Sequence, residues 1–202
     1  MREITLYNYN ELVSEDAKEL ARQQVIDCDY FGSDLDAELR MTFREKLKEL
    51  GIEDLEVEYS LSYSQGDGVA FYGYIDNDHL WNWVDESVLS DDEIKLVNMC
   101  VLGKANLDIN IERNHWGHHY SHWNCMEVNI PFYDGDDLPF DDDKMEELMR
   151  GLESKIKDIV QVKSRALESL GYDMIEEFNS KENMERLLEE YMVDFYEEGY
   201  LF

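Results

Sequence analysis

Alternating apolar and polar residues over positions 55–75 predict two half-buried strands that pair as a hairpin. In the first strand, Leu55, Val57 and Tyr59 fall on one face. Residues 65–68, Gln-Gly-Asp-Gly, favour a tight turn between the strands because glycine readily adopts positive φ. We expect this hairpin to set the register of an antiparallel sheet.

Apolar residues at helical spacing predict helices on both sides of the hairpin. Ser14 is expected to cap the first of them, and Ser90 with Glu93 forms the pattern of a capping box. The longest periodic segment predicts a helix of roughly 45 Å. The expected helices span residues 14–28, 35–50, 76–87, 90–100 and 141–170, with a last one from 179 to 195.

Three more alternating stretches predict strands within residues 1–9, at 107–111 and at 126–130, where Pro131 would end the strand. The elements together predict an α+β fold, in which an antiparallel sheet of about four strands has helices on one face and a long C-terminal helical pair follows. The expected domains are an α+β core over 1–133 and an acidic helical segment over 134–202, packed on that core.

Charge is the strongest compositional feature, because 48 Asp and Glu oppose 18 Lys and Arg for a formal net charge of −30. Phosphate binding requires basic patches, so direct nucleic-acid binding is not expected. The expected partners are cations, metal ions or basic protein surfaces. Cys28, Cys100 and Cys125 contain no CxxC pair and are expected to be free thiols. No apolar run is long enough to cross a membrane, so we expect a cytoplasmic protein.

The acids themselves are candidates for a partner-binding surface. Duplex DNA carries one charge per ~1.7 Å of its axis, and a surface dense in carboxylates can imitate it. The alternative is an acidic, well-solvated surface without a partner. The residues predicted to stand in for phosphates are Asp85, Glu86, Asp91, Asp92, Glu93, Asp134, Asp136, Asp137, Asp141, Asp142, Asp143, Glu146 and Glu147.

A second candidate site is the histidine cluster formed by His115, His118, His119 and His122. Imidazoles with nearby carboxylates could bind zinc, nickel or manganese. The cluster contains no HExxH pattern, which favours the alternative of a polar hairpin tip whose rings stack on neighbouring aromatics. No other cofactor is expected, because the chain lacks a phosphate-binding loop and a G-x-S-x-G elbow. We predict no catalytic residue.

Three stretches together resemble a diffuse group of uncharacterised phage and prophage proteins. Residues 9–18 read YNELVSEDAK, similar to the opening Y-x-E-L-S-x-x-A-K of that group. Residues 64–68 read SQGDG and are followed by Phe71 and Gly73, and residues 119–122 read HYSH. Some members of the group carry antitoxin-like labels. The resemblance implies a phage or mobile-element origin, and it carries over no reaction and no site residue.

Charge and resemblance together predict a phage-encoded, non-enzymatic inhibitor of a host defence system, of the anti-CRISPR or anti-restriction type. It would occupy the basic groove of a nucleic-acid-binding host protein as a DNA or RNA mimic. One alternative is a metal-binding protein or metal-dependent enzyme that uses the histidine cluster. Another is an antitoxin-like partner of a basic toxin. A homodimer is compatible with each of these.

Overall fold

The computed structural model describes residues 5–114, 121–135 and 138–202, and the chain divides into two compact units. Unit 1 comprises Met1–Leu39 and Gly171–Phe202, and unit 2 comprises Arg40–Leu170. The boundary between residues 133 and 134 that the sequence suggested falls inside unit 2. Two helices, α2 (Gly32–Glu49) and α4 (Asp142–Phe178), contribute residues to both units.

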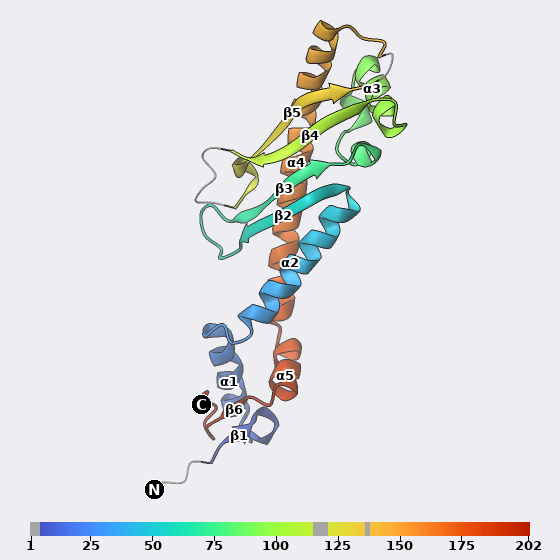
Figure 1. The fold of residues 1–202 in the computed structure, drawn as a ribbon. Helices are drawn as coiled ribbons and strands as arrows, with labels where there is room; N and C mark the ends of the chain where they lie inside the picture. Colours follow the sequence, from blue (N-terminus) through green and yellow to red (C-terminus); the bar gives the residue numbers. More distant parts are fainter. Residues whose placement is uncertain (1–4, 115–120, 136–137) are drawn as a thin grey trace. The chain divides into compact units, whose positions relative to one another are not determined.

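Unit 2 is built on a four-stranded antiparallel sheet with the strand order β2-β3-β4-β5 (Figure 1). Neighbouring strands pair so that Val57 lies opposite Phe71 and Ile111 lies opposite Val128. The predicted α+β fold with an antiparallel sheet of about four strands is therefore confirmed. The strands are β2 (Ile52–Ser60), β3 (Gly68–Ile75), β4 (Asn106–Arg113) and β5 (Met126–Asp134).

One face of this sheet is apolar and is covered by helices. Val57, Phe71 and Ile111 are buried on it, as the alternation in the sequence requires. The helix α4 crosses behind the sheet in Figure 1, and Ser164 Oγ on it donates a hydrogen bond of 2.5 Å to the carbonyl oxygen of Val69. The prediction of helices on one face is confirmed for unit 2.

Short 3-10 helices lie at both ends of the sheet in unit 2. The helix expected over residues 76–87 is instead two 3-10 helices, η2 (Asn77–Asn82) and η3 (Glu86–Val88). Asp76 and Asp85 cap them by accepting backbone hydrogen bonds, and such caps favour short turns over a continued α-helix. A 3-10 helix of three residues, η4 (Trp123–Cys125), precedes β5.

The connection between β2 and β3 differs from the predicted tight turn. Seven residues, 61–67, link the strands. The loop is long because the carboxylate of Asp67 accepts several hydrogen bonds from the serines that precede it. This carboxylate accepts hydrogen bonds from the backbone N–H of Ser62 at 2.6 Å and of Ser64 at 2.8 Å, and from the hydroxyl of Ser60 at 2.9 Å. Side-chain to backbone bonds of this kind compete with strand pairing, so β2 ends earlier than its alternation predicts.

Pro131 does not end β5, which continues to Asp134. β5 is an edge strand, and its pairing with β4 shifts register between Asp108 and Asn110, beside the proline. Proline lacks a backbone N–H and is tolerated on an edge strand or at a bulge, and both conditions hold here.

Gly73 in β3 lies so close to the backbone of β2 that a side chain at this position should destabilise the sheet. Its φ is +147°, and a Cβ atom there would clash with the carbonyl oxygen of Glu53 on β2 and lie 2.8 Å from Ile52 Cγ2. We expect Gly73→Ala to lower the free energy of unfolding by about 2 kcal/mol or more. Urea denaturation followed by circular dichroism measures this loss. Gly103→Ala is the matched control: Gly103 also has positive φ but has open space around it, so a loss as large as that of Gly73→Ala would contradict the role of the close approach.

Unit 1 is helical with a small antiparallel ribbon. The final helix ends at Glu190 rather than continuing to Phe195, and Phe195 instead belongs to a strand. Met192 has a positive φ of 49°, a left-handed conformation that cannot continue the helix. Ser180, not Asn179, caps this helix, and Ser14 precedes the first helix without a side-chain cap. The elements are β1 (Tyr7–Asn8), η1 (Tyr9–Glu11), α1 (Glu15–Asp27), α5 (Lys181–Glu190) and β6 (Asp194–Phe195), with parts of α2 and α4.

A buried arginine joins three elements of unit 1. Arg22 on α1 is 5% exposed, and it pairs with Glu185 on α5 at 2.6 Å and contacts the hydroxyl of Tyr9. The same hydroxyl donates to Glu185 at 2.9 Å. Burial, together with this hydrogen bond, raises the pKa of Tyr9 to about 12, so the phenol stays protonated as a donor.

The helix α4 is longer than predicted, since it ends at Phe178 instead of residue 170. Its 37 residues correspond to a length of about 55 Å. In the described part of the chain, neither α4 nor any other helix combines the length and the apolar character that crossing a membrane requires.

Candidate functional site

The structure brings two of the predicted groups of acids together in unit 2. One group lies in the first turn of α3 (Asp91–Val101), and the other lies in the first turns of α4. Lys144 on α4 joins them, because its ammonium lies 3.5 Å from Asp92 and 3.3 Å from Glu147. The end of β5 lies at the same place, since the hydroxyl of Tyr133 donates to Asp142 at 3.0 Å.

Most of these carboxylates are exposed and point to solvent. Asp92 is half-buried, and Lys144 and Arg150 are paired within the group, Arg150 with Glu146 at 2.8 Å. Like charges are tolerated here because the positive ends of two helices lie beside them. We call this group the acidic end; it comprises Asp91, Asp92, Asp141, Asp142, Asp143, Glu146 and Glu147.

The sequence predicted that Glu93 contacts a partner, but the structure buries its side chain. It is 4% exposed, accepts a hydrogen bond of 2.7 Å from the backbone N–H of Ser90, and pairs with Lys155 on α4. Burial alone would raise the pKa of Glu93, but the hydrogen bonds from Lys155 and Ser90 outweigh it and lower that pKa below its ordinary value. A buried, paired carboxylate is a link between α3 and α4, not a contact for a partner.

The other predicted acids are distributed as follows. Asp85 and Glu86 are exposed at η3, where Asp85 accepts hydrogen bonds from the backbone and hydroxyl of Ser87 that lower its pKa. Asp134 ends β5 and is exposed. Asp136 and Asp137 lie outside the described residues.

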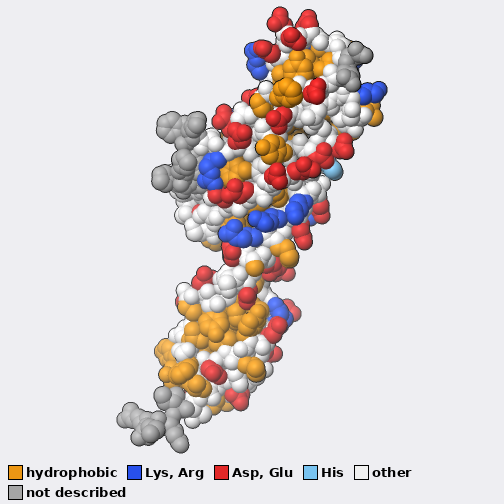
Figure 2. Space-filling view, viewed as in Figure 1, with side chains coloured by type: hydrophobic (Ala, Val, Ile, Leu, Met, Phe, Trp, Pro, Cys, Tyr) orange, Lys and Arg blue, Asp and Glu red, His pale blue; other side chains and the backbone are white. Residues whose placement is uncertain are grey.

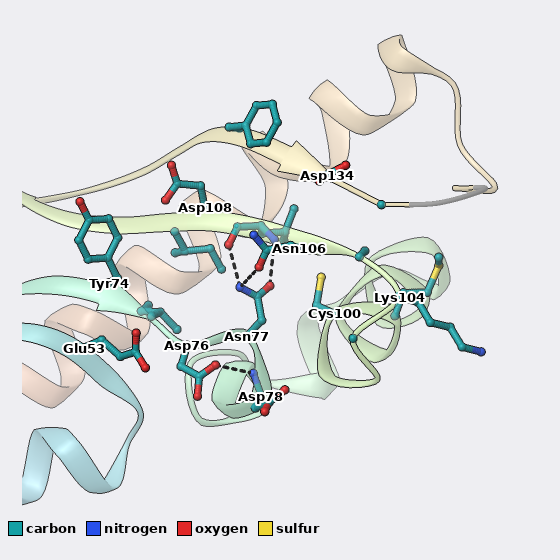
Figure 3. Close-up of a pocket in the computed structure, with 18 residues that line it drawn as sticks. Glu53, Tyr74, Asp76, Asn77, Asp78, Cys100, Lys104, Asn106, Asp108 and Asp134 are labelled. Atoms are coloured by element: carbon teal, nitrogen blue, oxygen red, sulfur yellow. Dashed lines mark hydrogen bonds between the residues drawn. The ribbon is translucent and has the colours of Figure 1, made fainter.

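Asp134 also lines a groove of about 1110 Å³ that the sequence did not reveal (Figure 3). The groove lies where β3 ends and β4 begins, between η2 and the end of α3. One cation, Lys104, lines it. The carboxylates that line it are Glu53, Asp76, Asp78, Asp108 and Asp134.

At the groove, the side chain of Asn77 bonds to the backbone of β4 in the position where β3 would otherwise pair with it. Beyond the pair of Tyr74 with Asn110, the strands β3 and β4 separate. There the side chain of Asn77 donates to the carbonyl oxygen of Leu107 at 2.8 Å and accepts from its N–H at 2.9 Å (Figure 3). The sequence Asp-Asn-Asp at residues 76–78 was the available signal, because it places two acids beside an amide directly after a strand.

The composition of the groove limits what it can bind. Small-molecule pockets are mainly apolar with a few polar groups, whereas five of the residues that line this groove are acids. Tyr74 and Phe132, 48% and 59% exposed, lie at its edge. The groove therefore suits a cationic ligand with an apolar or aromatic part.

The histidine cluster is described only at His122. Its Nδ1 accepts a hydrogen bond of 3.1 Å from the backbone N–H of Asn124 and so caps η4. His115, His118 and His119 lie outside the described residues, and the metal site stays a prediction. Over residues 5–114, 121–135 and 138–202, no group of three or more His, Cys, Asp or Glu side chains is placed to hold a metal ion.

Two of the three cysteines are buried inside unit 2. Cys100 and Cys125 are buried, and burial raises the pKa of the Cys100 thiol to about 12. A thiol with such a pKa is protonated at neutral pH and is a poor nucleophile. Cys28 is exposed, and all three cysteines are free.

Comparison with known proteins gives one match. A family model described as "Domain of unknown function (DUF8835)" matches residues 36–198. Neither the curated proteins nor the solved structures include a match to this chain.

Proposed function

The chain belongs to the family described as a domain of unknown function (DUF8835), and we propose that it is a non-enzymatic inhibitor that occupies a basic nucleic-acid-binding surface of another protein. The observation that carries this proposal is the acidic end, where seven carboxylates gather at the starts of α3 and α4 and Lys144 pairs with two of them, Asp92 and Glu147. Carboxylates fixed on helices are preorganised, so little conformational entropy is lost when a partner binds.

The charges favour this function over direct binding of nucleic acid. At a formal net charge of −30, the protein repels phosphates at long range and attracts basic grooves. Such attraction accelerates association and weakens as salt increases. The motifs that resemble phage and prophage proteins favour a host defence protein of the CRISPR or restriction type as the target.

Charge reversal in the acidic end tests the proposal. Asp141 is unsuitable because its side chain accepts from the N–H of Lys144 at 2.9 Å and caps α4. We expect the triple variant Asp91→Lys/Asp143→Lys/Glu147→Lys to weaken binding to the target by at least ~10-fold and to remain folded. The target is first recovered from a host lysate by pull-down at low and high salt, with DNA as competitor, and its affinity for each variant is then measured.

A matched control separates the acidic end from net charge. Glu45→Lys/Glu49→Lys/Asp158→Lys changes the charge equally at exposed positions of α2 and α4 in unit 2. This control should retain binding. Equal losses in the two triple variants, or no loss in either, would rule out the acidic end as the binding surface.

The groove favours a second candidate, an antitoxin-like partner of a basic protein. Its five carboxylates could accept an extended cationic segment that carries an aromatic or aliphatic side chain. In the same pull-down, a small basic protein whose recovery DNA does not reduce would support this candidate over the DNA mimic.

A further inference from the structure

Unit 1 contains two hollows on either side of Phe178, near the end of α4. The larger, of about 150 Å³, is lined by Glu38, Met174 and Glu177 besides this phenylalanine, and Asn183 and Arg186 complete its lining. The smaller, of about 50 Å³, is lined by Tyr30 and Leu35, among others. Both hollows therefore combine apolar side chains with acids, and Arg186 in the larger one is paired with Glu190 at 2.8 Å.

Exposed aromatic side chains continue the apolar surface beside the smaller hollow. Tyr30 and Tyr191 are 50% and 53% exposed, and both rings contact Phe31, at centroid distances of 5.0 and 5.2 Å. Met192, next in the chain, is 70% exposed. Figure 2 shows hydrophobic side chains gathered on the visible face of this unit, with carboxylates around them. Apolar surface left exposed in this way is typical of an interaction site.

The charge of unit 1 identifies the kind of partner. Its described residues, 5–39 and 171–202, include 19 Asp and Glu but only four Lys and Arg, a formal charge of −15. Each of the four cations lies within ion-pair distance of a carboxylate in the same unit. A second copy of the chain would bring two such charged surfaces together and would be repelled.

From the hollows, the exposed rings and this charge, we infer that unit 1 is a docking surface for a cationic amphipathic helix of another protein. Apolar side chains of that helix, one turn or two apart, would enter the hollows beside Phe178. Its Lys and Arg residues would face Asp29, Glu38 and Glu177 at their edges. This surface is separate from the proposed inhibitory function, because the acidic end belongs to unit 2.

The test uses the full chain and a defined probe, a fluorescein-labelled helix of about 18 residues composed of Leu and Lys with the Leu residues on one face. The control peptide has Ala in place of Leu and the same charge. Fluorescence anisotropy should show that the Leu/Lys peptide binds at least ~10-fold more tightly than the Ala/Lys peptide. Tyr30→Ser should reduce this preference.

Charge reversals locate the binding surface. Glu38→Lys/Glu177→Lys should weaken binding of the Leu/Lys peptide by at least ~10-fold, whereas the matched control Glu197→Lys/Glu198→Lys, also in unit 1, should change it less than ~3-fold. The triple variant of the acidic end should keep the preference for Leu over Ala, so that this result and the test of the proposed function are independent. Circular dichroism establishes that each variant is folded.

Three outcomes would overturn the inference. These are equal affinity for the two peptides, equal effects of the two charge reversals, and a dimer in analytical ultracentrifugation that Tyr30→Ser dissociates. The last of these would assign the surface to a second copy of the chain.

Discussion

Replacing Glu93 by alanine is expected to lower the free energy of unfolding by about 3 kcal/mol. The carboxylate is 4% exposed and serves two helices at once, because it completes the cap of α3 at Ser90 and pairs with Lys155 of α4. Its removal leaves the N–H of Ser90 and the ammonium of Lys155 without their acceptor in a partly buried place. Urea denaturation followed by circular dichroism measures the loss.

Two further variants separate the contributions to this loss. Glu93→Gln keeps an acceptor for Ser90 but removes the charge, so it should cost less than alanine. Asp91→Ala removes an exposed acid from the same first turn and should cost less than ~1 kcal/mol. If Asp91→Ala and Glu93→Ala were equally destabilising, the link between α3 and α4 would not be the cause.

The same carboxylate predicts a pH dependence. The pKa of Glu93 is lowered in the folded protein from its ordinary value of 4.5. The stabilisation that it contributes is therefore present above that ordinary value and is lost as the pH falls through the lowered pKa. The difference in unfolding free energy between the native chain and Glu93→Gln should thus shrink as the pH decreases below about 4.5. A difference that stayed constant would contradict the ion pair.

Glu93 also shows why the sequence predicted the cap of α3 but misassigned the role of this carboxylate. The capping box with Ser90 is a local pattern, so the start of α3 was correctly predicted. The partner Lys155 is 62 positions away, and no local pattern announces that contact. The approach also depends on Gly151, where a Cβ atom would lie 2.5 Å from Glu93 Oε1. Sequence alone therefore placed a buried structural acid among the candidates for partner binding.

The same distinction applies to the sheet and its groove. Periodicity located the four strands of the sheet in unit 2, though not all of their ends, because every second side chain of a half-buried strand packs in the core. It did not predict the connection at Asp67 or the groove at Asn77, because in both places a side chain replaces a backbone partner. Such replacements depend on which strands lie side by side, and the spacing of apolar residues carries no information about them.

The distribution of charge is a finding that required the structure. The total of −30 follows from the sequence, but half of it belongs to the described residues of unit 1, which form about a third of the chain. In unit 2, Lys144 lies between acids of α3 and α4, and Lys155 of α4 pairs with Glu93 of α3, which reduces the repulsion among the acids. In unit 1, Asp29 instead lines a hollow together with the half-exposed ring of Tyr30.

Trp83 is expected to be the largest single contributor to the core of unit 2. Trp81 and Trp83 both fall in the segment 76–87, and the structure buries Trp83 completely while leaving Trp81 partly exposed. Its ring packs near Phe71 with centroids 6.1 Å apart, and its Nε1 donates to the carbonyl oxygen of Leu50 at 2.8 Å. It therefore joins the sheet, η2 and the end of α2.

Trp83→Ala should lower the free energy of unfolding by about 4 kcal/mol, because it leaves a large cavity against Phe71 and removes the donor to Leu50. Trp83→Phe keeps most of the packing and should cost about 1 to 2 kcal/mol, the loss of the hydrogen bond included. Trp81→Ala is the matched control in the last turn of η2, which ends directly before Trp83, with an expected loss below ~1 kcal/mol because its side chain reaches solvent. Urea denaturation measures the free energy of unfolding of the three variants. Similar losses for Trp81→Ala and Trp83→Ala would show that burial of Trp83 does not hold the end of α2 against the sheet.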